Sequence, residues 1–189
     1  LVSRQGKDEL GALERHGQTE RYLAWIQEQP TAKFTGYPYD LYKAAVKAKG
    51  LAQQGTYDRQ FQGLIDLAKS DRGGIRENVW CALDTSGSMG TPVAPNLTAI
   101  EVCLGLGLYF SALNEGAFRD HVVMFDAQSR IVHLEGTFTQ RVKKLSKLET
   151  AWGTTNFQSV IDAVVELRTD RPTLPPEAFP TTLLVVSDM

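Results

Sequence analysis

The sequence predicts an α/β protein in which a helical region, residues 1–76, precedes a mainly parallel sheet formed by residues 77–189. Two observations predict this class. Up to about residue 76, apolar residues recur at the three- and four-residue spacing of helix faces. From residue 78 onward, short apolar runs alternate with helical stretches, which is typical of a doubly wound sheet with helices on both faces.

The helical region is expected to contain three segments that end at turn-forming residues. The helices are expected at residues 8–29, 39–49 and 57–69, with a break in the first at Gly17. Pro30 and Gly50 are typical stop signals. Residues 31–38 are expected to form a loop, and residues 70–77, which contain two adjacent glycines, a linker.

The second region is expected to alternate strands and helices. Strands are predicted at residues 79–83, 121–125, 130–134 and 181–186, and helices at 97–114, 139–148 and 156–167. The continuous apolar runs 122–125 and 183–186 indicate central strands, whereas the alternating run 130–134 indicates a position near the sheet edge. Gly105 and Gly107 are expected to let the helix 97–114 approach the sheet closely.

Composition and charge narrow the classes of function. The chain has 189 residues, of which 42% are hydrophobic and 22% charged, and its formal net charge is −2. This balance gives no general attraction to nucleic acid, so no DNA partner is expected. No apolar run approaches the roughly 18 residues that span a bilayer, so no membrane is expected either. Cys81 and Cys103 lie in apolar segments and are expected to be reduced, which indicates a cytoplasmic protein.

The informative motif is Asp84-Thr85-Ser86-Gly87-Ser88, which directly follows the predicted strand 79–83. In open α/β sheets, ligands bind beyond the carboxyl ends of the strands. A carboxylate and two hydroxyls at alternate positions of a tight turn can converge on one point there. The alternative is a polar turn in which Asp and Ser only cap a helix.

Two further segments carry oxygen donors at comparable places. Thr154 and Thr155 precede a predicted helix, and Asp188 lies just past the end of the last predicted strand. Oxygen-only ligand sets suit Mg²⁺, and also admit Mn²⁺ or Ca²⁺. The alternatives are that Thr155 caps the following helix and that Asp188 has no role.

The segments DTSGSM, GTTNF and VVSDM together resemble the metal-ion-dependent adhesion site of von Willebrand factor A domains. The resemblance implies a Rossmann-like domain of which residues 78–189 form the first two-thirds, so the sequence looks truncated at its C-terminus. It implies that Mg²⁺ is held by five residues: Asp84, Ser86, Ser88, Thr155 and Asp188. An Asp or Glu of a protein partner would complete the coordination.

The resemblance leaves two residues in less defined places. Thr154 is the rival of Thr155 for the threonine position because the two are adjacent. Asp126, just past the strand 121–125, is a candidate for a supporting acid behind the ligands, although such a residue more often starts a turn. The function implied is metal-dependent protein binding, as an adhesion or scaffold module. No catalytic residues are expected, because no phosphate-binding glycine loop or nucleophile triad is present.

The arrangement of helices before an adhesion-type site also resembles Ro (TROVE-like) ribonucleoproteins and an uncharacterised family of viral and eukaryotic proteins. The first resemblance implies RNA binding by the helical region, through Lys43, Lys47 and Lys49. The alternative is that these lysines form a solvated helix face, since acidic residues interleave with the basic residues of this region. The second resemblance implies a structural or assembly component of a virus particle.

Overall fold

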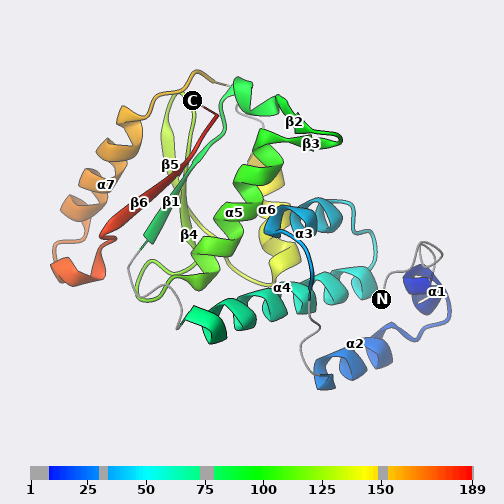
Figure 1. Ribbon diagram of the computed structural model, residues 1–189. Coiled ribbons are helices and arrows are strands. Elements are labelled where there is room, and N and C mark those ends of the chain that lie inside the picture. The colour runs from blue at the N-terminus through cyan, green and yellow to red at the C-terminus, as the bar shows by residue number, and fades with distance from the viewer. Residues whose placement is uncertain (1–8, 30–33, 73–78, 149–152, 189) are drawn as a thin grey trace.

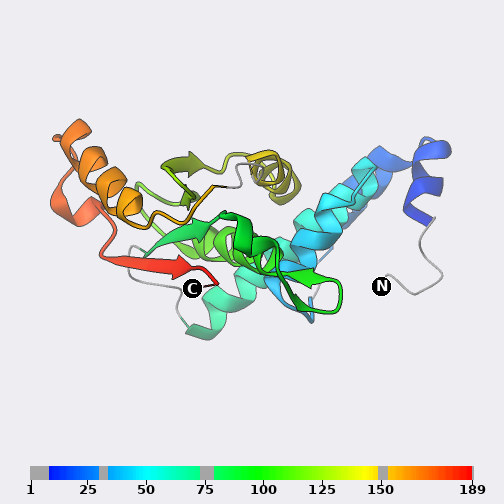
Figure 2. The same ribbon diagram turned by 90° about the horizontal axis from the view of Figure 1, so that it is seen from above.

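The computed structural model describes residues 9–29, 34–72, 79–148 and 153–188. A four-stranded sheet lies between helices on both faces, and the N-terminal helices extend from one side of this layered body (Figures 1 and 2). The expected α/β class and the helical region before the sheet are therefore confirmed.

The first predicted helix is divided into two, α1 (Glu9–Arg15) and α2 (Thr19–Glu28). The division falls at Gly17, whose φ of +64° is a left-handed conformation that glycine adopts without steric cost. The predicted break at Gly17 is therefore confirmed. The loop predicted over residues 31–38 lies partly outside the described residues.

The next two helices, α3 (Pro38–Val46) and α4 (Leu51–Arg72), lie close to their predicted positions. Helix α4 is longer than predicted and takes up the first three residues of the expected linker, whose remaining residues, 73–77, lie outside the described residues. The early part of α4 carries Gly55, which lowers helix propensity. Tertiary packing overrides this local signal, because a Cβ atom at Gly55 would lie 2.3 Å from the side chain of Leu23 in α2.

The sheet has the order β5-β4-β1-β6. Strand β1 (Val79–Asp84) pairs in parallel with β4 (His121–Phe125) on one side and with β6 (Thr182–Val186) on the other. Strand β5 (Ser129–His133) pairs antiparallel with β4, so the sheet is mixed. The edge position predicted for β5 and the central position predicted for β4 are confirmed.

The central position predicted for the run 183–186 is wrong for the described residues, because β6 lies at the edge of their sheet. Leu183 packs against the core on one face of the sheet, and Leu184 and Val186 pack against the core on the other face. Val185 is 38% exposed. A continuous apolar run indicates apolar contacts on both faces of a strand, although no residue of β6 is fully buried. It carries no information on whether the strand has one neighbour or two.

The two faces of the sheet form two cores because side chains alternate along each strand. Cys81 and Leu83 of β1 face the core built by α5 (Ala99–Leu113) and α6 (Phe138–Leu148). Trp80 and Ala82 face the core covered by α7 (Gln158–Asp170). Helices therefore cover the described sheet on both faces.

Helices α3 and α4 share the first of these cores with α5 and α6. Leu41 of α3 and Ile65 of α4 are buried in it, and the ring of Phe61 stacks on that of Phe138 at 4.2 Å. The helical region therefore packs directly on the sheet-bearing part of the chain.

The two glycines of α5 have different neighbours. A Cβ atom at Gly107 would lie 2.4 Å from the Leu83 side chain in the sheet, as predicted. A Cβ atom at Gly105 would instead lie 2.5 Å from the backbone of Tyr39 in α3. The prediction that Gly105 serves contact with the sheet is therefore wrong, because α5 presents this position to α3.

A short hairpin precedes α5 and was not predicted. Strands β2 (Pro92–Ala94) and β3 (Leu97–Thr98) pair antiparallel across a turn in which Asn96 has a φ of 60°. Helix α5 therefore begins two residues later than predicted, where the Glu101 side chain accepts a hydrogen bond from the backbone N–H of Thr98. Two short 3₁₀ turns, η1 (Gly87–Gly90) and η2 (Pro176–Ala178), complete the described elements.

Candidate metal centre

The first loop of the site leaves β1 inside the core and emerges at the carboxyl edge of the sheet. Asp84 is 0% exposed and Ser86 is buried, whereas Ser88 is exposed. The backbone N–H and the hydroxyl of Thr85 both donate to the carbonyl oxygen of Phe125, at 2.8 and 3.1 Å. This double hydrogen bond ties the loop to the end of the neighbouring strand β4.

The loop after β6 reaches the same edge because β1 and β6 are parallel (Figure 1). The hydroxyl of Ser187 donates to Oδ2 of Asp84 at 2.6 Å, and the backbone N–H of Ser86 donates to Oδ1 at 2.8 Å. The Ser86 and Ser88 hydroxyl oxygens are 3.2 Å apart, and Ser88 Oγ donates to Oδ1 of Asp188 at 3.0 Å. The two loops are therefore joined by a connected set of carboxylates and hydroxyls.

The loop before α7 lies beside the first loop. The backbone N–H of Gly87 donates to the carbonyl oxygen of Gly153 at 3.3 Å. A Cβ atom at Gly153 would lie 2.9 Å from the backbone nitrogen of Ala127, so glycine allows this close passage. Thr155, partly buried, and Thr154, exposed, follow two and one residues later. The structure therefore places the loop of the two threonines beside the first loop. The choice of Thr155 over Thr154 as the metal ligand stays a prediction.

Asp126 supports this third loop through its backbone. Its carbonyl oxygen accepts a hydrogen bond from the N–H of Asn156 at 2.8 Å. Its carboxylate accepts from the N–H of Gln128 at 3.2 Å and so closes its own turn. Asp126 therefore starts a turn, which is the alternative given for it from the sequence. A supporting role behind the metal ligands stays a prediction.

Cys103 of α5 lies beneath the meeting point of β1 and β6. Its Sγ is 3.6 Å from the carbonyl oxygens of both Asp84 and Val186. Cys81 lies within β1, where burial raises the pKa of its thiol to about 12. Both cysteines are buried and neither forms a disulfide. With its raised pKa, Cys81 is not available as a thiolate ligand at neutral pH.

The donor set fits a hard cation. The residues on the two hydrogen-bonded loops offer carboxylate and hydroxyl oxygens, which are the ligands that Mg²⁺, Mn²⁺ and Ca²⁺ take. Within the described ranges, no three His, Cys, Asp or Glu side chains come together in a way that could hold a metal. The candidate centre accordingly depends on its serine hydroxyls as much as on Asp84 and Asp188.

Two residues that position the site carried little signal in the sequence. Ser187 was recognised as part of the last loop, but its contact with Asp84 depends on how β6 pairs with β1. Gly153 looks like an ordinary loop glycine until its distance to Ala127 is known. The only local signal for Ser187 is a hydroxyl directly before the candidate ligand Asp188.

The lysines considered for RNA binding are not equivalent. The ammonium of Lys43 donates to the carbonyl oxygen of Asn96 in the β2–β3 turn and lies 3.6 Å from the Glu101 carboxylate. Lys43 therefore ties α3 to the hairpin and α5. Lys47 and Lys49 are exposed.

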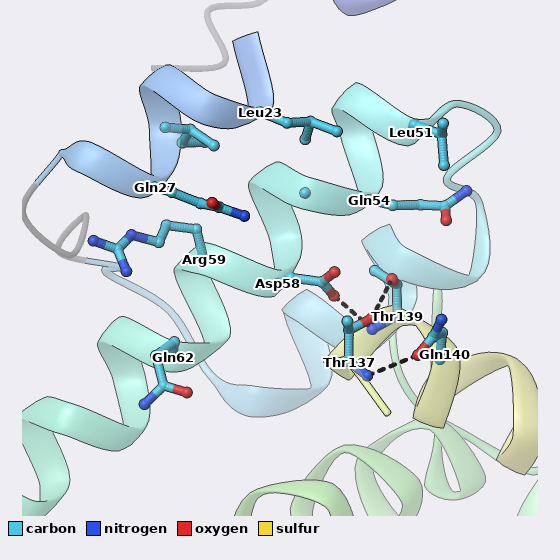
Figure 3. Close-up of a pocket in the computed structure, with 12 residues that line it drawn as sticks. Leu23, Gln27, Leu51, Gln54, Asp58, Arg59, Gln62, Thr137, Thr139 and Gln140 are labelled. Atoms are coloured by element: carbon cyan, nitrogen blue, oxygen red, sulfur yellow. Dashed lines mark hydrogen bonds between the residues drawn. The ribbon is translucent and has the colours of Figure 1, made fainter. Parts of the chain in front are cut away.

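A groove of about 400 Å³ lies between α2, α4 and the start of α6 (Figure 3). In it, Oδ1 of Asp58 accepts a hydrogen bond from the N–H of Thr139 at 2.7 Å, and the Gln140 side chain accepts one from the N–H of Thr137 at 2.9 Å. Both side chains satisfy backbone donors at the beginning of α6. None of the residues lining the groove belongs to the three loops of the candidate centre.

Comparison with known proteins identifies a family but no described relative. No curated protein and no solved structure matches the chain. Of the described helices, none has the length and apolar character needed to cross a membrane. One family model, described as a domain of unknown function (DUF7788), matches residues 79–189, which is more than half of the 189 residues and contains all three loops of the candidate centre. The chain therefore belongs to the DUF7788 family.

Proposed function

We propose that this chain binds a divalent cation, Mg²⁺ first, at the carboxyl edge of its sheet and uses the ion to bind a protein partner. The observation that carries this proposal is the hydrogen-bonded set of Asp84, Ser86, Ser88 and Asp188, drawn from two loops a hundred residues apart. Such a convergence of oxygen donors at the ends of parallel strands supports the resemblance to an adhesion-type metal site.

The arrangement of the sheet supports a domain of the von Willebrand factor A type. Three parallel strands, β4, β1 and β6, are neighbours, and helices cover both of their faces. These are features of a doubly wound, Rossmann-like sheet. The antiparallel strand β5 stands at the edge, where mixed sheets commonly carry one.

The roles proposed for the residues follow from the hydrogen bonds that their side chains make. Ser86, Ser88, Asp188 and a threonine of the third loop, Thr155 first, would hold the ion. Asp84 has both carboxylate oxygens engaged by the protein, so it would contribute its buried negative charge and order the loop. The bound ion would supply a positive charge with an open coordination position, and a partner carboxylate suits that position.

A protein partner is favoured by exposed apolar side chains on the segments that follow the loops in the chain. Val93, in β2, is 57% exposed, and Phe157, after the third loop, is 36% exposed. Exposed apolar side chains are features of protein-binding surfaces.

Titration calorimetry with Mn²⁺ tests the metal site. The wild type is expected to bind one Mn²⁺, and Asp84→Asn, which keeps the shape of the side chain, is expected to lose most of the affinity. Asp66→Ala is the matched control, because Asp66 is an exposed aspartate on α4 that contacts Gln62. The absence of saturable binding in the wild type, or full affinity in Asp84→Asn, contradicts the proposal.

A further inference from the structure

We infer that Ser187 is a positioning residue of the candidate metal centre, which it serves by holding the buried carboxylate of Asp84 with its hydroxyl. This inference rests on the proposed function and adds a residue that the resemblance does not supply. It assigns no direct contact with the ion to Ser187.

The geometry around Asp84 leaves each of its oxygens with a protein donor. The backbone N–H of Ser86, in the same loop, donates to Oδ1 at 2.8 Å. The hydroxyl of Ser187, 103 positions later in the chain, donates to Oδ2 at 2.6 Å. A hydroxyl-to-carboxylate hydrogen bond of this length is charge-assisted and about twice as strong as a neutral one. Because Asp84 is 0% exposed, water is poorly placed to replace the Ser187 donor.

Ser187 and Asp188 are adjacent and hold two different parts of the β1 loop. Ser187 contacts the buried carboxylate at the base of the loop, and Asp188 contacts the exposed hydroxyl of Ser88 at its tip. The contact at the base therefore sets where the next residue, Asp188, meets the tip. Losing it leaves Asp84 with one donor fewer and weakens the link between the end of β6 and the loop.

Partners behind metal ligands have a characteristic energetic effect. Removing one typically weakens metal binding by about 10- to 100-fold, although the removed group never touches the metal. The structure places Ser187 in that relation to the loop that carries Ser86 and Ser88.

The experiment compares two side chains of the same shape at position 187 in the full chain. Ser187→Thr keeps a hydroxyl, and Ser187→Val replaces it by a methyl group with nearly the same volume. Mn²⁺ affinity is measured by calorimetry well below the unfolding temperature of each variant, which is recorded separately. We expect near wild-type affinity for Ser187→Thr and about 10-fold weaker binding for Ser187→Val.

Ser111→Ala is the matched control for a general loss of stability. The Ser111 hydroxyl is buried and donates to the carbonyl oxygen of Leu108, within α5 and outside the three loops. Its removal is expected to lower the unfolding temperature and leave the Mn²⁺ affinity unchanged.

The outcomes separate this inference from the proposed function. If the wild type binds Mn²⁺ and Ser187→Val binds it equally well, Ser187 has no positioning role and the metal site stands. An equal loss of affinity in Ser187→Val and Ser111→Ala also overturns the inference, because the effect then follows stability alone. If the wild type itself does not bind Mn²⁺, the proposed function and this inference fail together.

Discussion

The hydroxyl of Ser88 donates a 3.0 Å hydrogen bond to the carboxylate of Asp188, a residue 100 positions later in the chain. Both side chains are exposed at the carboxyl edge of the sheet. The contact is possible because β1 and β6 pair in parallel, so that the carboxyl ends of both strands lie at the same edge of the sheet.

Replacing Asp188 by alanine is expected to separate metal binding from stability. Asp188 is exposed, so its loss should change the free energy of unfolding by less than about 1 kcal/mol. Mn²⁺ affinity should fall by at least about 10-fold, since even indirect partners of a metal have effects of that size. Calorimetry and urea denaturation measure the two quantities. Asp162→Ala, at an exposed position of α7, should change neither, and unchanged affinity in Asp188→Ala would remove this residue from the site.

A methyl group at position 153 is expected to displace the third loop. The added Cβ would lie 2.9 Å from the backbone nitrogen of Ala127, a contact that requires one backbone to move. Gly153→Ala should cost about 1–3 kcal/mol of stability and weaken Mn²⁺ binding. Gly87→Ala is the control in the facing loop, because an added Cβ meets no atom within 4 Å there. Equal behaviour of the two variants would show that the close passage at Gly153 is unimportant.

Helix α5 is expected to tolerate alanine differently at its two glycines. Alanine in a helix gains about 1 kcal/mol over glycine from propensity alone. At Gly105 the added Cβ meets the backbone of Tyr39, which cannot rotate away, so a net loss of stability is expected. At Gly107 it meets the tip of Leu83, a side chain that can adjust, so the loss should be smaller. Urea denaturation measures the free energy of unfolding of both variants. A larger loss of stability in Gly107→Ala than in Gly105→Ala would contradict this reasoning.

Acidification is expected to destabilise the protein through His121. Its ring stacks on that of His133 on the paired strand, with centroids 4.2 Å apart. Burial lowers the pKa of His121, the hydrogen bond to the Arg119 carbonyl raises it, and the positive charges of His133 and Arg171 lower it further.

The sign of the pH effect follows from the lowered pKa. The unfolded chain takes up the proton at a higher pH than the folded protein does. The contribution of His121 to stability is therefore fully present above about pH 6.5, the ordinary histidine pKa, and is lost as the pH falls below it. Urea denaturation at about pH 7.5 and about pH 5.5 should show a larger loss in the wild type than in His121→Gln. An equal loss in both would assign the effect to other groups.

Much of the fold could be predicted from local patterns. The four strands of the main sheet and the helices around them lie within a few residues of their predicted places, because periodicity and stop signals are local properties. The β2–β3 hairpin escaped prediction because its strands are only three and two residues long. The length of α4 escaped prediction because contact with α2 overrides the low propensity of Gly55.

The sequence by itself determined the α/β class, the break at Gly17 and the chemistry of the candidate site, since these depend on residue types and their spacing along the chain. Only the tertiary structure decided which strands are neighbours, and with that the edge position of β6 among the described strands and the contact between Ser187 and Asp84. Pairing between strands a hundred residues apart depends on how the whole chain packs. A local hydrophobic pattern indicates which faces of a strand have apolar contacts, whereas the packing of the rest of the protein determines which strand pairs with it.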